Sequence, residues 1–354
     1  MIASGLPDLD PSGDDVHRAK DVAVAPDGTV YFNVGSSSNA NPDDRTFSPP
    51  RAVIMAVRPD GSDLRVVEEG VRNGEGLAVA PGGIVWTAVN ERDNIPDAAG
   101  QVVQSFVNEH PPDEVVPVTA GRDLGWPYCD PDQDADHGSL ADVPLVPDPV
   151  TNPGGRTMNC AALAPVEVGL PAHSAPLGMS FLEGTAVPAP WSGGAVLAVH
   201  GSWDRQPPRA PAILWLAWNG AKDTLMPAIT LVSGFQNADG SRWGRPVDVV
   251  PGPGGALYVS DDMASATTAW RQARFHNWLW YFCYPAEGSA AVRRISARAC
   301  SAAWLSGWSA AIKSPSRTPS VRSMAWMTSA RVAGRSVPGS ARRSAASWCW
   351  ALAR

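Results

Sequence analysis

The sequence predicts an all-β protein built as a β-propeller. Three stretches, Asp21–Gly35, Gly76–Asn90 and Val247–Asp262, share one pattern, in which an alternating apolar run leads through a Pro-x-Gly turn into a second strand. Proline sets φ at about −65° and glycine accepts a positive φ, as a tight turn between strands requires. Each stretch is therefore predicted to be a β-hairpin. Radial repetition of near-identical hairpins is typical of a propeller, whereas a β-sandwich does not explain their recurrence.

The composition agrees with many short strands. The chain holds 34 Pro and 33 Gly, which argues against a helical bundle, and its 44% of hydrophobic residues excludes wholesale disorder. Further hairpin signals occur at Ala52–Val67 and Gly194–His200. No run approaches the roughly 18 apolar residues of a membrane span, and residues 1–10 lack the pattern of a signal peptide. No integral membrane segment and no signal peptide in this chain are therefore expected.

The charge is divided between two unlike segments. Although the net charge of the chain is −7, residues 263–354 carry one acid against 13 bases, and they show no period of 2 or 3.6. A basic segment could bind nucleic acid or an acidic membrane surface. The same mixture of Arg, Ala, Ser and Trp is typical of a GC-rich gene translated out of frame. We interpret residues 263–354 as an irregular tail, out of frame or disordered, and expect no nucleic-acid partner.

A polar group precedes each of the three hairpins at the same place in the repeat. His17 precedes the first hairpin, Arg72 and Asn73 precede the second, and Arg245 precedes the third. Equivalent positions of successive blades surround the same end of a propeller's central channel, so these side chains are predicted to converge on one axial pocket. A pocket with a histidine and several arginines suits a polyanionic ligand. Each residue taken alone is equally compatible with a solvated loop charge.

Seven motifs follow one another along the chain: His17 with its hairpin, Gly70–Ala78, Asn90–Asp93, Gly125–Cys129, His173–Met179, His200–Arg205 and Trp243–Pro246. Their order resembles that of the soluble quinoprotein sugar dehydrogenases, and the sorbosone dehydrogenase-like branch is the most similar. The resemblance covers residues 14–262. It implies a six-bladed β-propeller family that binds pyrroloquinoline quinone (PQQ) and calcium, here incomplete with about four blades.

The resemblance implies roles for individual residues. His17 matches the general base that takes the substrate hydroxyl proton while hydride passes to PQQ. Arg72 and Asn73 match a pair beside the quinone oxygens, where the arginine stabilises charge that develops on reduction, so Arg72 is predicted to be catalytic as well as cofactor-binding. The other predicted cofactor-binding residues are Arg245, His200 and Arg205. For calcium the resemblance points to Asn90, Glu91 and Arg92, where backbone carbonyls and a side-chain amide supply oxygen ligands.

The predicted function is PQQ-dependent oxidation of an aldose or sugar aldehyde of the glucose or sorbosone type, with an unidentified electron acceptor. Two alternatives stay open from the sequence. Missing blades favour a catalytically inactive propeller fragment or binding module, and a calcium-dependent lactonase propeller is disfavoured by the order of the motifs. The location that the family implies is periplasmic or secreted.

The resemblance also predicts domain ends and a disulfide. A complete member has one or two further blades before His17, so residues 1–13 are expected to be an N-terminal remnant and residues 14–262 a partial propeller catalytic domain. This branch tends to carry a cysteine pair that matches Cys129 and Cys160, and a bridge between them would require an oxidising compartment. The three remaining cysteines lie in the tail and lack the Cys-x-x-Cys spacing of a zinc site.

Overall fold

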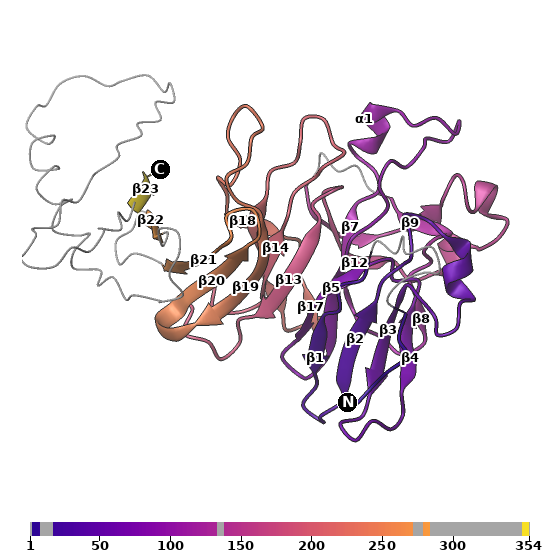
Figure 1. Ribbon diagram of the computed structural model, residues 1–354, viewed down its shortest axis with the longest axis horizontal. Helices are drawn as coiled ribbons and strands as arrows, with labels where there is room; N and C mark the ends of the chain where they lie inside the picture. Colours follow the sequence, from indigo (N-terminus) through magenta and orange to yellow (C-terminus); the bar gives the residue numbers. More distant parts are fainter. Residues whose placement is uncertain (1, 8–16, 133–137, 272–278, 284–348, 354) are drawn as a thin grey trace, which may run out of the picture. The chain divides into compact units, whose positions relative to one another are not determined.

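The computed structural model describes residues 2–7, 17–132, 138–271, 279–283 and 349–353. In these residues the protein is nearly all-β, and four larger sheets, antiparallel except for one short pair, follow one another along the chain (Figure 1). Contacts divide the chain into one unit that is essentially Met1–Trp280 and a second unit, Tyr281–Leu352. Most of β22 (Leu279–Cys283) and β23 (Cys349–Ala353) belongs to the second unit, where they pair. Most of the predicted tail and of the predicted N-terminal remnant lies outside the described residues.

The first two sheets contain the predicted hairpins around Pro26, Pro59 and Pro81. The first sheet consists of β1 (Val22–Val24), β2 (Val30–Val34), β3 (Val53–Val57) and β4 (Arg65–Glu69), with the short β8 (Arg122–Asp123) parallel to β4. The second has the order β10 (Leu140–Val143), β12 (Val166–Leu170), β7 (Asp113–Pro117), β6 (Val85–Val89) and β5 (Gly74–Val79). Gly28 has φ +86° in the first turn, a conformation that glycine adopts without strain.

The third sheet consists of β13 (Pro176–Phe181), β14 (Ala195–Val199), β15 (Ala212–Leu216) and β18 (Ile229–Val232). Short elements complete the described fold: α1 (Gln104–Val107), β9 (Cys129–Pro131), β11 (Leu145–Pro147), β16 (Trp218–Asn219), β17 (Thr224–Leu225) and 3-10 turns at Pro42–Arg45, Pro153–Gly155, Cys160–Ala162 and Pro253–Gly255. Among the described helices, none has the length and apolar character needed to cross a bilayer.

The fourth sheet continues past the predicted domain end at residue 262. It contains β19 (Pro246–Gly252), β20 (Ala256–Asp261) and also β21 (Ala266–Arg271), which pairs with β20 along its whole length. Thr268 and Trp270 of β21 are buried, two residues apart, as a strand with one inward face requires. The six residues of β21 have mostly small side chains, so their apolar alternation was too weak to predict a strand from the sequence.

The innermost strands of neighbouring sheets approach closely at two glycines. β13 lies between β5 and β19. A Cβ added to Gly76 in β5 would lie 2.2 Å from the carbonyl oxygen of Leu177, and one added to Gly178 in β13 would lie 2.0 Å from a carboxylate oxygen of Asp248. Both distances are far below van der Waals contact, so only glycine permits this approach. The two contacts fix the strands whose ends carry the predicted site.

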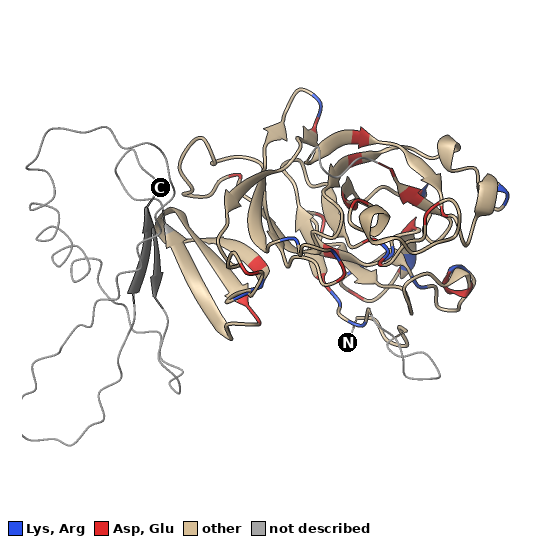
Figure 2. Ribbon diagram, turned by 90° about the horizontal axis from the view of Figure 1, so that it is seen from above, with Lys and Arg blue, Asp and Glu red and all other residues tan. Residues whose placement is uncertain are grey.

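An ion-pair network centred on the buried Arg122 guanidinium joins the first and second sheets. Figure 2 shows acidic and basic positions intermixed along the part of the ribbon that forms these sheets. Arg122 Nη1 lies 2.9 Å from a carboxylate oxygen of Glu167, and its Nε lies 3.8 Å from Glu68. Burial raises the pKa of Glu68 to about 8, an effect that Arg122 opposes. Two hydrophobic clusters fill the spaces between the first and second and between the second and third sheets.

The predicted disulfide between Cys129 and Cys160 is confirmed, with the two Cα atoms 5.6 Å apart. Both cysteines belong to the hydrophobic cluster between the first two sheets. The bridge closes a sequence separation of 31 residues, and this segment contains β9 and β11. It therefore joins β9 to the 3-10 turn Cys160–Ala162 and closes the segment between them.

Replacing both cysteines, Cys129→Ser with Cys160→Ser, should lower the free energy of unfolding by roughly 3–4 kcal/mol, the loop-closure entropy of a segment of this length. Urea denaturation of the two proteins measures the difference. A reducing agent should destabilise the wild type to the same extent and leave the double variant unchanged. Equal stability of both proteins without reductant would contradict a structural role for the bridge.

Candidate functional site

The predicted site residues lie in loops at one end of the strands. Arg72 is in the loop before β5, Asn90 follows β6, and Arg245 precedes β19. In an antiparallel sheet the start of one strand and the end of the next lie at the same end. The topology therefore brings the loops before the innermost strands together with the loops after the second strands.

Arg72 is the centre of this end of the molecule. Its side chain is 3% exposed. Nη1 donates hydrogen bonds to the backbone oxygens of Asn90 (3.0 Å) and Glu91 (2.7 Å), and Nε and Nη2 donate to the backbone and side-chain oxygens of Asn39 (3.1 and 2.9 Å). Nη2 also lies 3.4 Å from a carboxylate oxygen of Asp93. One guanidinium thus joins the loop after β2 to the loop after β6.

His17 has a defined tautomer. Its Nδ1 lies 2.8 Å from Ser36 Oγ, and Ser36 Oγ donates its single proton to the backbone oxygen of Ser38 at 2.7 Å. Ser36 must therefore accept from His17, so that Nδ1 carries the hydrogen in the neutral ring. The lone pair is then on Nε2, which is the atom that can take up a proton.

The surroundings of His17 keep its ring neutral. Burial, and after it the positive charge of Arg72, lower the pKa of His17 from 6.5 to about 3. His17 packs directly against Gly35, because a Cβ added to Gly35 would lie 2.5 Å from His17 Cβ. A neutral imidazole near pH 7 is the state that a general base requires.

Asn73 is oriented by an acid that the sequence analysis did not single out. Its Nδ2 donates to Glu75 Oε1 at 3.1 Å, which leaves Oδ1 buried without a hydrogen-bond partner. Asn73 and His17 both lie close to Gly35, since a Cβ added to this glycine would be 3.0 Å from Asn73 Oδ1 and would also meet His17. Burial raises the pKa of Glu75, and its hydrogen bond from Asn73 opposes that effect. The sequence could have identified Glu75 as a site residue, because it belongs to the same Gly70–Ala78 motif as Asn73.

Arg245 and His200 form a second group. Arg245 Nε donates to the backbone oxygen of His200 at 3.2 Å, and His200 Nε2 lies 3.0 Å from Asp262 Oδ1. Burial lowers the pKa of His200, although the hydrogen bond to Asp262 opposes the shift. The structure thus places these two predicted residues together. No described contact joins them to His17 or Arg72 directly.

Trp203 lies in the His200–Arg205 motif, and Arg242 directly precedes the Trp243–Pro246 motif as part of the polar group before the third hairpin. Neither was assigned an individual role from the sequence. The indole of Trp203 is 67% exposed, which is unusual for so large an apolar side chain. Burial, and then the charge of Arg245, lower the pKa of Arg242, so two guanidinium groups lie near each other. Exposed aromatic surface next to paired cations suits a flat anionic ligand.

Arg205 is directed elsewhere. Its Nε donates to the backbone oxygen of Asn108 at 3.2 Å, and Nη2 lies 3.4 Å from Glu109 Oε1, just after α1. Its Nη1 donates to the backbone of Pro207. The described contacts of Arg205 are therefore with the loop after α1, a segment that the sequence did not identify as structured.

The predicted calcium segment has other partners in this structure. The backbone oxygens of Asn90 and Glu91 accept hydrogen bonds from Arg72, and the guanidinium of Arg92 pairs with the buried Asp148. The Glu91 carboxyl is buried, which raises its pKa. Oxygen donors of the type that calcium prefers are present, but a cationic side chain already binds them. These residues do not fit a calcium ion in this arrangement.

A family model described as TrAA12-like matches residues 10–268. The chain belongs to the TrAA12-like family. The structure is similar to a carbohydrate-active enzyme of family AA12 from Trichoderma reesei, with 19% identity, a TM-score of 0.55, and coverage of 73% of this chain and 71% of that one. It is also similar to the holo form of the PQQ domain of pyranose dehydrogenase from Coprinopsis cinerea, with 22% identity, a TM-score of 0.54, and coverage of 71% and 69%.

A relative in sequence is an uncharacterized protein of Borreliella burgdorferi, 27% identical over 239 residues. These residues are 67% of this chain and 55% of the relative, so the chain spans about half the length of that protein. The expected nearly all-β fold is confirmed, and the family model shows membership in the TrAA12-like family. The closed propeller and the oxidation of a sugar stay predictions. The sorbosone branch and the roles of single residues stay predictions.

Arg72→Lys should lower the free energy of unfolding by about 2–4 kcal/mol, because an ammonium group has three donors and cannot reach the acceptors that the guanidinium satisfies. Chemical denaturation measures this loss. Arg65→Lys, on the exposed part of β4, is the matched control and should change stability by less than about 0.5 kcal/mol. Similar losses in both variants would show that Arg72 does not hold the loops.

The depressed pKa of His17 predicts a dependence of stability on pH. Because the folded ring resists protonation, the contribution of His17 to stability is present above pH 6.5 and is lost as the pH falls towards 3. His17→Gln should therefore gain stability relative to the wild type as the pH is lowered from 7 to 4. Urea denaturation at both values tests this, with the partly exposed His110→Gln as the control. A difference that is independent of pH would contradict the buried neutral state.

Proposed function

We propose that the protein oxidises an aldose or a sugar aldehyde with PQQ as the hydride acceptor and His17 as the general base. The observation that carries the proposal is a partly buried, neutral His17 whose Nε2 lone pair is available for a proton, beside the fixed cation of Arg72. The likeness to the PQQ domain of pyranose dehydrogenase supports the choice of cofactor. The sugar and the electron acceptor are left open.

The residues at this end of the strands fit PQQ in chemical type. PQQ is planar and carries three carboxylates, so it requires cations and a flat apolar surface. Arg245 and Arg242 supply adjacent guanidinium groups, Trp203 supplies an exposed indole, and Asn73 Oδ1 is a buried acceptor without a partner. We assign PQQ binding to these residues together with His200 and Arg72. Arg205 stays a predicted contact, although its described partners follow α1.

The chain's own groups divide the work of the reaction. Bound PQQ supplies the hydride-accepting quinone. His17 Nε2 takes the proton of the substrate hydroxyl, while Nδ1–H holds the ring in place by its hydrogen bond to Ser36. Arg72 makes the protonated His17 unfavourable, so the proton is readily passed on to water, and the same cation stabilises negative charge that develops nearby.

The proposed location is periplasmic or extracellular. The disulfide between Cys129 and Cys160 supports an oxidising compartment, because such bridges are rare in proteins kept with reduced thiols. The partner that we propose is a small sugar. We propose no nucleic-acid partner, because residues 1–262 hold 34 acidic residues against 15 basic ones.

The proposal is tested by adding PQQ to the purified chain and measuring binding by calorimetry and the oxidation of glucose and sorbosone with an artificial dye. Both signals are expected. His17→Ala should lower kcat by roughly 10²–10⁴, with PQQ affinity nearly unchanged. Arg245→Ala should instead weaken PQQ binding first, because a contact to the cofactor's charge is lost.

His110→Ala serves as the control and should change neither quantity, because His110 lies against Phe106 beyond α1. Failure of the wild type to bind PQQ would overturn the assignment. Binding without any turnover would favour an inactive binding module. Equal effects of His17→Ala and Arg245→Ala on PQQ affinity would contradict the separate roles.

A further inference from the structure

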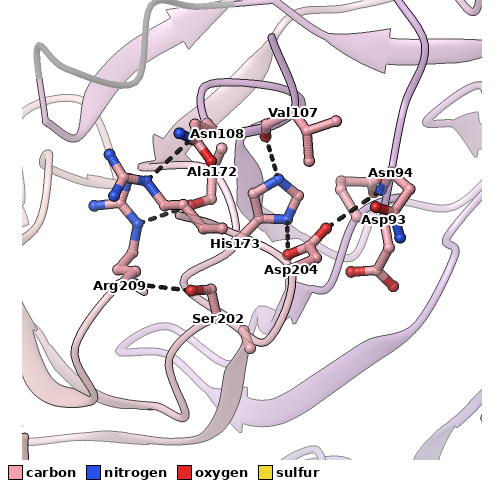
Figure 3. Close-up of polar contacts among 12 residues, drawn as sticks. Asp93, Asn94, Val107, Asn108, Ala172, His173, Ser202, Asp204 and Arg209 are labelled. Atoms are coloured by element: carbon pink, nitrogen blue, oxygen red, sulfur yellow. Dashed lines mark hydrogen bonds and ion pairs between the residues drawn. The ribbon is translucent and has the colours of Figure 1, made fainter. Parts of the chain in front are cut away.

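Asp93, His173 and Asp204 form a second polar cluster (Figure 3). Asp93 of this cluster lies 3.4 Å from Arg72. Each residue offers one ligand atom, and these atoms lie within 4.8 Å of one another. Asp93 follows β6, His173 precedes β13, and Asp204 follows β14, so three loops of the second and third sheets meet here. The side chains of His173 and Asp204 are only 4% and 2% exposed.

The hydrogen bonds of His173 leave two acceptors facing each other. Nε2 lies 2.6 Å from the backbone oxygen of Val107, and a carbonyl only accepts, so Nε2 carries a hydrogen (Figure 3). In a neutral ring the lone pair is then on Nδ1, which lies 3.3 Å from Asp204 Oδ1. That oxygen is buried and makes no hydrogen bond, whereas Oδ2 accepts from the backbone N–H of Asn94.

A proton or a metal ion must therefore lie between Nδ1 and Oδ1, because two buried lone pairs at this distance repel each other. A proton would be shared between the ring and the carboxyl of Asp204. The proton would give an isolated pair of His173 with Asp204, to which Asp93, already held by Arg72, would contribute nothing. The metal ion explains why the third carboxylate lies within reach of both.

We propose that Asp93, His173 and Asp204 bind a divalent ion of the zinc class. Imidazole nitrogen with two carboxylates is a donor set of zinc sites, whereas calcium takes oxygen ligands. Ligand atoms of a tetrahedral ion with bonds of about 2.0–2.1 Å lie about 3.3–3.4 Å apart. Nδ1 and Oδ1 are 3.3 Å apart. The two carboxylates balance the charge of the ion.

Neighbouring groups orient the three side chains by hydrogen bonds of the kind that orient ligands in metal sites. The ring N–H that does not face the ion donates to a backbone carbonyl, that of Val107. The backbone of Asp93 is fixed by two hydrogen bonds with Asn39, at 2.9 and 2.8 Å. Arg72 lies 3.4 Å from Asp93 Oδ2, so the other oxygen of Asp93 is the one assigned to the ion.

The ion would have a structural role that does not depend on PQQ. It would join the loop that carries Asn90 and Glu91, which bind Arg72, to the loop that carries His200 and Trp203. No described hydrogen bond connects Arg72 to the 200–205 loop directly. The metal site would thus couple the two groups of the candidate site through Asp93 and Asp204.

The test is zinc binding by the full chain after treatment with a chelator, without PQQ. Calorimetry and elemental analysis should give one tightly bound Zn²⁺ per chain, with a raised thermal midpoint. Asp204→Asn and Asp93→Asn should each weaken binding by at least about 10–100-fold, and His173→Gln should do the same. Asp93 is partly exposed, so its variant keeps the test valid if a buried replacement fails to fold.

Two controls separate this site from other zinc ligands. His110→Gln, which removes a histidine 3.9 Å from Asp132, should bind Zn²⁺ like the wild type. A variant with Cys283, Cys300 and Cys349 all changed to Ser should also retain the site, and bound Co²⁺ should show a spectrum without thiolate bands. Binding that persists in all three ligand variants, or is lost with the cysteines, would overturn the proposal. So would a metal-free wild type whose His173 carries protons on both nitrogens by NMR.

Discussion

The hydrogen bonding of one buried guanidinium governs this end of the protein. Arg72 donates to the backbone oxygens of Asn39, Asn90 and Glu91, and none of these loops contains regular structure that would satisfy those oxygens otherwise. Buried carbonyls without a donor cost about 1–3 kcal/mol each. The paths of the loops after β2 and β6 therefore depend on the side chain that enters from the loop before β5.

The same cation sets the electrostatics around it. It adds to burial in keeping His17 neutral, and it opposes the effect of burial on the carboxyl of Asp93. Asp93 in turn lies next to His173 and Asp204. A charge that is fixed by backbone acceptors cannot move away from a neighbour when the neighbour titrates, so structure and chemistry at this site are coupled through Arg72.

The sequence was most informative where the determinants are local. Period-2 runs around Pro-x-Gly turns located the strands of the hairpins, and the order of motifs led to the family and to the pair Cys129–Cys160. It was least informative where the interaction is with backbone. The family resemblance assigned the segment Asn90–Arg92 to calcium, yet the backbone oxygens of Asn90 and Glu91 accept hydrogen bonds from Arg72. Short β21 was missed because small side chains carry little hydrophobic signal.

The sequence by itself determined the strands, their turns and the residue types available for chemistry, because backbone preference and alternation act over a few neighbouring residues. Only the tertiary structure decided which polar groups are partners. His17 with Ser36, Arg245 with the His200 carbonyl, and His173 with Asp204 lie 19, 45 and 31 residues apart. Such pairs form because packing of the inner strands at Gly76 and Gly178 brings loop ends together, and burial then requires each donor to find an acceptor.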